Sequence, residues 1–139
     1  MMKRFERLDV TKVAADSMRE TKQDFIEWQQ EQMNTGKKST GGPIKPFYRP
    51  ATVRIKKAKG QPYDRVTLKD TGAFQDSFFL VVKPGDGTFK VVFTNIKGPW
   101  LVDKYGESIF GLGGVYKVGY VRDLRPVFMR NIKKELKVP

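Results

Sequence analysis

The spacing of apolar positions near the start of the chain predicts a long helix. Apolar or small side chains recur every third or fourth residue, which is the period of one helix face. These positions are Val10, Ala14, Met18, Thr21, Phe25 and Trp28. Asp9 is a typical N-cap residue, and Gly36 stands where a helix-ending glycine belongs. We therefore expect a helix over residues 10 to about 33 that packs on a sheet, although its length would also suit a contact between subunits.

The middle of the chain predicts a β-hairpin. Two runs of β-branched and aromatic residues, 78–83 and 88–94, flank a glycine-bearing turn at 84–87. In the second run Phe89, Val91 and Phe93 alternate with Lys90 and Val92, so one face of the hairpin is strongly apolar. We expect that face to contact the long helix.

Shorter patterns surround the hairpin. Residues 70–78 predict a helical turn capped by Asp70 and Thr71, and residues 100–105 predict a short helix or turn that ends at Gly106. Residues 115–120 are typical of a short strand. Residues 121–137 predict a terminal helix with Pro126 in its first turns, where a missing N–H costs little. The apolar stripe of that helix is Leu124, Val127 or Phe128, Ile132 and Leu136.

Residues 36–62 are predicted to form an extended arm. Glycines and prolines interrupt this segment and argue against any long helix or central strand. They are Gly41, Gly42, Pro43, Pro46, Pro50, Gly60 and Pro62. Residues 52–55 could still form a short edge strand. Loops longer than about 12 to 15 residues are usually functional or disordered, so we expect a partner, or the docking of Phe47 and Tyr48, to order the arm.

The net charge of +12 is concentrated in two segments. Residues 36–69 carry ten basic residues against Asp64 alone, a net of +9, and residues 117–137 carry a net of +5. Basic and aromatic residues interleaved in a Gly- and Pro-rich segment suit contact with a phosphate backbone, although a charge run is often only a solvated face. Since the chain has no motif that reads bases, any contact with DNA should not depend on the DNA sequence. The candidate contact residues are Lys37, Lys38, Lys45, Arg49, Arg54, Lys56, Lys57 and Lys59.

The residue inventory argues against an enzyme. The chain has no cysteine and no histidine, so disulfides, thiolate metal sites and the commonest general base are excluded. A hydrolytic pair or the metal site of a nuclease would have to come from carboxylates whose spacing demands neither. These are Asp64, Asp70, Asp76, Asp103 and Glu107. The glycine clusters lack the context of a phosphate-binding loop. We expect no catalytic, metal or cofactor site.

Length and hydropathy predict the number of domains and bear on whether the chain spans a membrane. A chain of 139 residues is one domain by the usual prior. No run of about 18 apolar residues is present, so we expect no membrane span. Lys3 and Arg4 are followed by polar residues instead of an apolar stretch, which argues against a signal peptide.

Two motifs flank the predicted hairpin. The first, VTLKDTGAFQDSFF at 66–79, contains Leu68, Asp70, Thr71, Gly72, Phe74 and Ser77. The second, LVDKYGESIFGL at 101–112, contains Lys104, Tyr105, Gly106, Ile109, Phe110, Gly111 and Leu112. Together they resemble the tail-completion or neck proteins of tailed bacteriophages, a virion-morphogenesis family in which an L-x-D-T-G-x-F/L-x-x-S segment precedes a hairpin and a K-Y-G-x-x-I-F-G-L segment follows it. The resemblance covers roughly residues 20 to 137.

The resemblance implies an α+β fold in which a long N-terminal helix and a C-terminal helix pack on a small, mostly antiparallel sheet. It also implies a virion structural protein, assembled in the cytoplasm of the bacterial host, that forms an oligomeric ring at the head-to-tail junction or the end of the tail tube. Its partners would be portal, connector or tail proteins. The arm is more basic and Pro-rich than the family pattern demands, so it could face DNA or an acidic protein surface. The alternative is a free nucleic-acid-binding or packaging-accessory protein that tolerates sequence changes.

The apolar residues of the two motifs and their neighbours are expected to form part of the core. Their spacing beside caps and glycines suits packing against the hairpin. The residues expected there are Leu68, Phe74, Phe78, Ile109, Phe110 and Leu112.

Overall fold

The computed structural model describes residues 9–83 and 88–137. It shows an α+β fold with helices packed on a two-stranded antiparallel sheet, as the sequence predicted. The elements in chain order are α2 (Val10–Glu20), α3 (Lys22–Asn34), α4 (Pro50–Ala58), α5 (Ala73–Asp76), β1 (Phe79–Lys83), β2 (Thr88–Val92), α6 (Gly98–Tyr105), the 3-10 turn η1 (Glu107–Ile109) and α7 (Gly114–Leu136).

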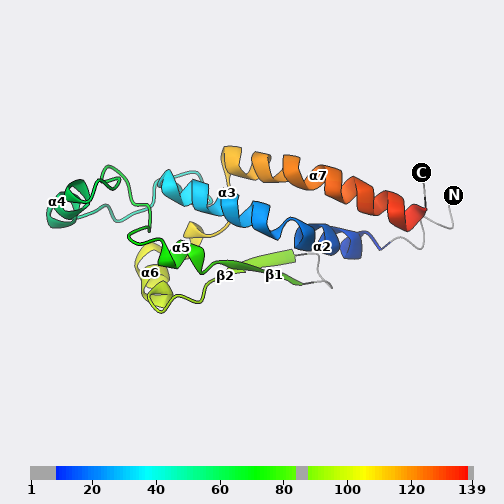
Figure 1. Ribbon diagram of the computed structural model, residues 1–139, viewed down its shortest axis with the longest axis horizontal. Coiled ribbons are helices and arrows are strands. Elements are labelled where there is room, and N and C mark those ends of the chain that lie inside the picture. Colours follow the sequence, from blue (N-terminus) through cyan, green and yellow to red (C-terminus); the bar gives the residue numbers. More distant parts are fainter. Residues whose placement is uncertain (1–8, 84–87, 138–139) are drawn as a thin grey trace.

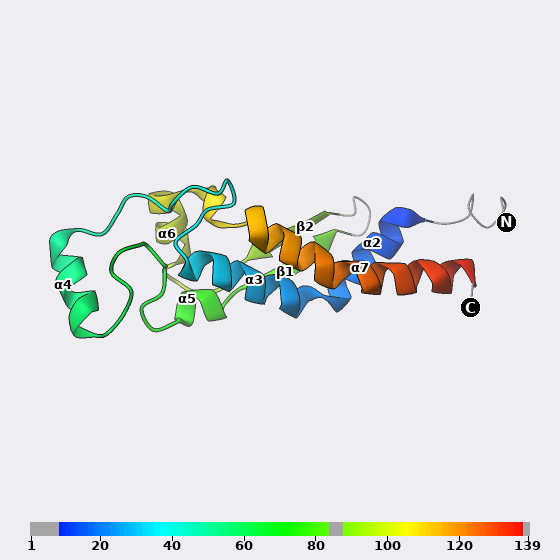
Figure 2. The same ribbon diagram turned by 90° about the horizontal axis from the view of Figure 1, so that it is seen from above.

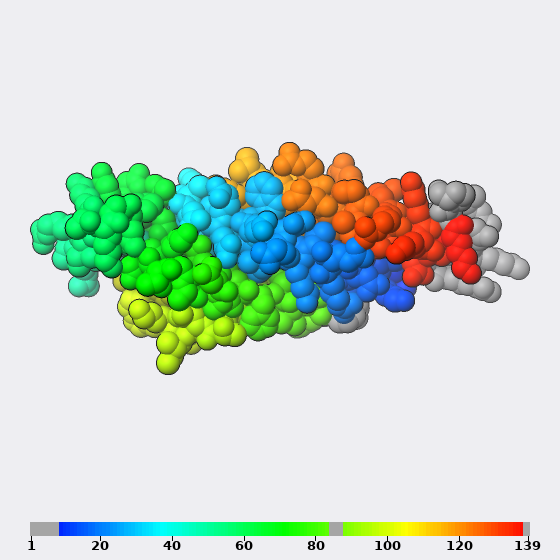
Figure 3. Space-filling model, in the orientation of Figure 1, coloured from blue at the N-terminus to red at the C-terminus, as the bar shows by residue number. Residues whose placement is uncertain are grey.

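The molecule is elongated, with its helices along the long axis (Figure 1). Helix α7 runs antiparallel to α2 and α3 and packs on both, and β1 packs on the other side of the same helix pair. Helices α5 and α6 lie at the end of the hairpin that is nearer the C-terminal end of α3 (Figure 1). Helix α4 lies at the extreme end of the molecule (Figures 1 and 2). The space-filling view shows the same elongated outline, with the α4 region as its tip (Figure 3).

The predicted N-terminal helix is divided into α2 and α3 at Thr21. The backbone of Thr21 leaves the helical region at φ −106° and ψ 18°. Its hydroxyl donates to the carbonyl oxygen of Ser17 at 2.9 Å and shares a 3.0 Å hydrogen bond with the Tyr120 hydroxyl of α7. A threonine bonded to the carbonyl four residues earlier bends a helix, so the same hydroxyl both bends the helix and links it to α7. The Asp9 cap is confirmed, since its carboxylate accepts from the Lys12 N–H at 3.1 Å.

The strand predicted over residues 115–120 is wrong, because α7 begins at Gly114 and includes them. The hydroxyls of Tyr116 and Tyr120, one helical turn apart, reach Thr35 and Thr21 near the two ends of α3. These contacts outweigh the strand preference of the valines and tyrosines, which depends strongly on packing. Pro126 consequently lies inside α7 and not in its first turns.

The edge strand predicted over residues 52–55 is also wrong, because these residues belong to α4. Pro50 occupies the first turn of that helix, where proline is favoured because its fixed φ suits the helix and its missing N–H needs no partner. Lys56 and Lys57 lie in the last turn, where positive charge opposes the negative end of the helix dipole. The predicted loop therefore carries a short helix of its own.

The predicted hairpin is confirmed. Strands β1 and β2 pair antiparallel, with Phe79 opposite Val92 and Lys83 opposite Thr88, while the turn at 84–87 lies outside the described residues. The apolar face of β2 meets the long helix as expected, since the Phe89 ring packs edge-on against Phe25 with centroids 4.7 Å apart. The opposite face carries exposed Phe79 and Val81.

An aromatic cluster brings the two sequence motifs together. Phe74 packs edge-on against Phe78 at 4.9 Å, Phe78 contacts Phe110 at 5.5 Å, and Phe93 stacks on Phe110 at 5.8 Å. Of the six residues expected in the core, Leu68, Phe74, Phe78 and Ile109 are buried, and Phe110 and Leu112 are partly buried against them.

Two buried glutamines of α3 hold the segment that follows η1. The Gln29 amide donates to the Ile109 carbonyl at 3.1 Å and accepts from the Gly111 N–H at 2.8 Å. The Gln32 amide donates to the Gly111 carbonyl at 2.7 Å and accepts from the Gly113 N–H at 2.9 Å. The irregular backbone between η1 and α7 thus finds its hydrogen-bond partners on a helix, as buried backbone groups require.

Candidate interface at the basic arm

The basic arm, residues 36–62, carries α4 away from the rest of the molecule (Figure 2). A small bridge pairs Lys37 with Pro43 at its base, and the Lys38 N–H donates to the Gly42 carbonyl at 2.8 Å. The Ser39 N–H donates to the Ser108 carbonyl at 2.8 Å, which joins this base to η1. Side-chain contacts of the returning chain then fix the position of α4.

Lys56 and Tyr48 are the central contacts between the arm and the body. The Tyr48 hydroxyl accepts from the Thr67 N–H at 3.0 Å, and the Lys56 ammonium lies 4.9 Å from the centre of the Tyr48 ring. The ammonium also donates to the Lys69 carbonyl at 3.3 Å and to the Gln61 side chain at 3.5 Å. Lys56 is only 8% exposed. Its side chain therefore holds the arm in place and has little surface left for a polyanion.

Lys59 and Gln61 both bind Asp70, which is not the helix cap that the sequence predicted. The Lys59 ammonium lies 3.2 Å from the carboxylate, and the Gln61 amide donates to the Asp70 carbonyl at 2.9 Å. The hydrogen bonds from Lys59 and then Gln61 lower the pKa of Asp70 below its ordinary value. The N-cap position of α5 is taken by Gly72 at φ +90°, and the Thr71 hydroxyl accepts from the Ala73 N–H at 3.3 Å.

Two further lysines of the arm cover exposed aromatic rings. Lys57 lies 4.6 Å from the Tyr63 ring centre and Lys45 lies 5.6 Å from that of Phe47. Such cation–π contacts contribute about 0.5–1 kcal/mol at exposed sites, and they leave the ammonium groups open to solvent. The rings hold these lysine side chains in place without neutralising their positive charge.

The remaining predicted contact residues keep their positive charge available at the surface. Among residues 9–83 and 88–137, no ion pair involves the side chains of Lys37, Lys38, Arg49 or Arg54. Arg49 and Arg54 lie at the start and in the middle of α4, and both are exposed. With Lys57 they give the tip of the molecule a positive surface.

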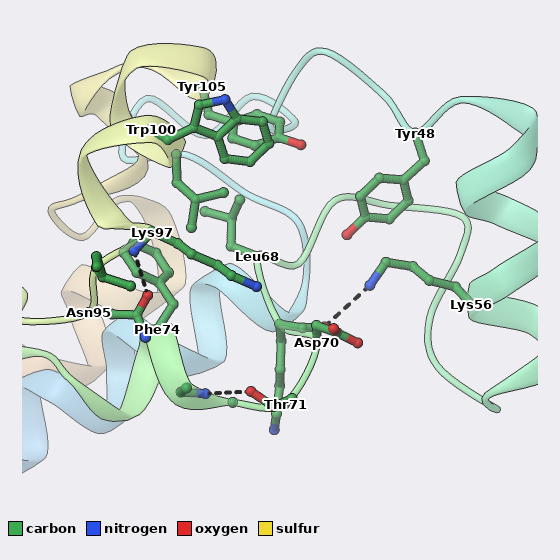
Figure 4. Close-up of a pocket in the computed structure, with 15 residues that line it drawn as sticks. Tyr48, Lys56, Leu68, Asp70, Thr71, Phe74, Asn95, Lys97, Trp100 and Tyr105 are labelled. Atoms are coloured by element: carbon green, nitrogen blue, oxygen red, sulfur yellow. Dashed lines mark hydrogen bonds between the residues drawn. The ribbon is translucent and has the colours of Figure 1, made fainter.

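An open cavity of about 280 Å³ separates the arm from α6. Figure 4 shows Trp100 and Tyr105 on one side, Tyr48 and Lys56 on the other, and Leu68 between them. The side chain of Lys97 extends toward Leu68. Burial raises the pKa of the Tyr105 phenol, and proximity to Tyr48 adds to that effect. The cavity is bounded by both motif segments and by the arm.

Sequence reasoning missed this cavity and its lining residues Ile96 and Lys97, and it placed Trp100 only in a short helix or turn. They come from a separate part of the chain, and only the fold places them beside the arm. One local signal was available: Lys104 follows Trp100 at helical spacing, and its ammonium lies 5.1 Å from the Trp100 ring centre. Gln29 and Gln32 were also missed as contacts of the second motif. Trp28 was expected on the packing face of the N-terminal helix, but its partners are Asp123 and Gly119 of α7 and not the sheet.

The described residues hold no group of three or more acidic side chains placed to bind a metal ion. Within the same ranges, no helix has the length and apolar character needed to span a membrane. Asp64, one of the carboxylates considered for catalysis, pairs with its neighbour Arg65 at 2.7 Å.

Comparisons of the chain with protein families, curated proteins and solved structures find no match. The resemblance to phage neck proteins therefore rests on the two motifs. In the first, the Ser77 hydroxyl donates to the Phe74 carbonyl at 2.7 Å and accepts from the Thr94 N–H at 3.3 Å, which ties the segment to the end of β2. In the second, Gly106 at φ +87° ends α6, and Gly111 at φ +93° lies where the chain meets Gln29 and Gln32.

Proposed function

We propose that this chain is a structural protein of the head-to-tail junction of a tailed bacteriophage, a neck or tail-completion protein that works as an oligomeric ring. One observation carries the proposal: the two motifs that resemble this family pack together as one unit beside the hairpin. Phe74 and Phe78 of the first motif contact Phe110 of the second, and Phe93 at the end of the hairpin closes the cluster. The motifs thus act as a scaffold, and the arm is the part that extends from it.

The exposed part of the arm supports a contact with DNA or with a neighbouring virion protein. Arg49, Arg54 and Lys57 present positive charge at the tip, and Lys37 and Lys38 add to it at the base. Such a surface binds phosphate by displacing counterions and needs no particular base sequence. We leave Lys56 out of the proposed contact because it is buried, and Lys59 contributes less because Asp70 pairs with it.

The proposal is tested by electron cryomicroscopy of particles whose genome encodes this chain. The expected result is symmetric density at the neck or the tail end into which the elongated molecule fits. Intact particles without symmetric density for this chain would refute the junction role.

The alternative is a free nucleic-acid-binding or packaging-accessory protein, and the positive tip favours it equally. Size-exclusion chromatography of the purified chain with and without duplex DNA separates the two functions. A stable complex of DNA with a monomer or dimer, together with absence of the chain from purified particles, would support the alternative.

A further inference from the structure

The cavity between the arm and α6 combines an apolar floor with exposed positive charge at its walls. We propose that it binds a bulky apolar side chain presented by an acidic segment of a neighbouring virion protein. The inference rests on the proposed function, because it names the kind of protein partner that the arm would contact in the assembly.

The apolar part of the cavity suits one large side chain. Leu68 and Phe74 are buried beneath it, whereas Trp100 is 61% exposed and Ile96 is 92% exposed at its edge. Trp and Ile that stand together in solvent beside a cavity are typical of an interaction site. The volume of about 280 Å³ is roughly nine times the 30 Å³ that a water molecule occupies in the liquid. That space accepts a leucine or an aromatic side chain.

The charge around the cavity selects an acidic partner. Lys56, Lys69 and Lys97 line it, and no ion pair involves these side chains within the described ranges. Lys104 adds a fourth positive charge above Trp100. Among the described residues that line the cavity, Asp70 is the single carboxylate, and Lys59 already pairs with it. A segment with carboxylates on either side of its apolar anchor would therefore complement the site in both charge and shape.

A peptide fits this site better than duplex DNA does. A duplex presents phosphates on a convex surface and has no side chain that could enter an apolar cavity. A base of single-stranded DNA could stack on Trp100. The other two rings at the edge of the cavity, Tyr48 and Tyr105, are partly buried, and the ammonium groups of Lys56 and Lys104 already lie over them, so neither offers a free face to enclose the base.

Fluorescence anisotropy with the full chain tests the proposal. The probe is a labelled, Asp-rich peptide with a central leucine, and its control has serine in place of that leucine. We expect saturable binding of the leucine peptide, and weaker binding by about tenfold or more for Trp100→Ala and for Lys97→Glu. Both side chains lie at the surface, so both variants should fold, which circular dichroism verifies. Lys133→Glu on α7, at the other end of the molecule, is the matched charge control and should bind as the wild type does.

Three results would overturn the inference. One is no binding of the leucine peptide. Another is equal affinity for the leucine and serine peptides, which would show that charge alone governs binding. A third is binding of oligo-dT, abolished in Trp100→Ala, with no peptide binding, which would make the cavity a nucleic-acid site.

The imaging experiment is independent of these results. Ring density without peptide binding would overturn this inference alone, whereas peptide binding without ring density would overturn the junction role and keep the peptide site.

Discussion

At the residue scale, hydrogen bonds between side chains and a distant backbone hold the molecule together where regular structure ends. Gln29 and Gln32 are completely buried, yet each satisfies one carbonyl and one N–H of the segment before α7. Removing Gln32 leaves the Gly111 carbonyl and the Gly113 N–H, which are partly buried, without their side-chain partner. A fully buried unpaired group costs about 1–3 kcal/mol, and a partly buried one costs less.

We therefore predict that Gln32→Leu lowers the free energy of unfolding by about 1–3 kcal/mol. Leucine has a similar volume, so loss of hydrogen bonds is the main effect. Urea denaturation at neutral pH measures it. Gln23→Leu on the exposed side of the same helix is the control and should change stability little. Equal stability of the two variants would contradict the role assigned to Gln32.

Gly119 is a second residue whose identity the packing demands. A Cβ atom at this position would overlap with the Trp28 ring, whose indole N–H donates to Asp123 at 2.8 Å. Alanine is favoured over glycine in helices by about 1 kcal/mol, but inserting a methyl group into a packed contact costs typically about 1–3 kcal/mol.

We predict that Gly119→Ala lowers the melting temperature despite its helix preference. Differential scanning calorimetry gives the measurement. Val118→Ala is the comparison, because Val118 is exposed on the same helix, and that variant should match or slightly exceed the wild type. A rise in melting temperature for Gly119→Ala would show that Trp28 has room to move.

Glu20 gives the contact between α2 and α7 a dependence on pH. The hydrogen bond from Asn131 at 3.2 Å, helped by Arg130, lowers the pKa of the Glu20 carboxyl below its ordinary value of 4.5. A carboxylate with a lowered folded-state pKa stabilises the fold above the ordinary pKa, and this contribution is lost as the pH falls through the lowered value.

The pH-dependent part of the stability difference between the wild type and Glu20→Gln should therefore be largest near neutral pH, begin to shrink as the pH approaches 4.5, and vanish only below the lowered pKa. Urea denaturation across that range measures it. Because Glu20 is at the surface, the difference should be modest. Glu27→Gln serves as control, because Glu27 is exposed on α3 and accepts a hydrogen bond at 3.5 Å from Gln23 of the same helix. A stability difference that stays constant at all pH values would show that it does not arise from the lowered pKa of Glu20.

At the scale of the element, the aromatic cluster makes the hairpin, α5 and the η1 segment depend on one another. A two-stranded hairpin is marginal alone, and here the rings of Phe74, Phe78 and Phe110 join it to both motifs. We predict that Phe74→Ala and Phe110→Ala lower the unfolding free energy, by about 3–5 kcal/mol for the buried Phe74 and less for the partly buried Phe110. Thermal denaturation measures the effect, and unchanged melting temperatures would contradict a structural role for the motifs.

Elements could be predicted from the sequence where local preference and packing agree. The β1 and β2 residues prefer strands and also alternate in burial. Residues 115–120 have the same preference, but they belong to α7, where the hydroxyls of Tyr116 and Tyr120 bond Thr35 and Thr21 at the two ends of α3. Proline interrupts a helix at most positions, but it is favoured in the first turn, which is where Pro50 lies in α4.

The candidate site was predictable in its charge and not in its geometry. The basic composition of residues 36–62 is visible in the sequence. Lys56 is buried because its ammonium group donates to the carbonyl of Lys69. Local sequence patterns do not encode this contact. The same applies to Trp100, which only the fold places across the cavity from the arm (Figure 4).

At the scale of the whole molecule, the larger share of the net positive charge belongs to residues 36–69, so binding to a polyanion should depend mainly on the end that carries the arm. We predict that reversing the charge of Arg49, Arg54 and Lys57 weakens binding to duplex DNA. The slope of log K against log salt should shrink by roughly 0.9 for each phosphate that the variant no longer neutralises. A salt titration of DNA binding measures both quantities.

The matched control reverses the same number of charges on α7, at Arg122, Arg125 and Lys133, which are also exposed. It should keep most of the affinity and the slope. Equal losses in the two variants would show that net charge alone governs binding. Unchanged affinity and slope in the arm variant would refute the DNA contact and favour a protein partner.

The bond from the Thr67 N–H to the Tyr48 hydroxyl closes residues 48–67 into a loop at its own base. A loop that is closed at its base can change in length and composition at small entropic cost to the rest of the chain. Natural variants of this protein could therefore exchange the whole of α4 for another sequence while the hairpin and helices keep their packing. The proposed contact surface of the arm could then change separately from folding, with Tyr48 and Thr67 at the boundary between the two.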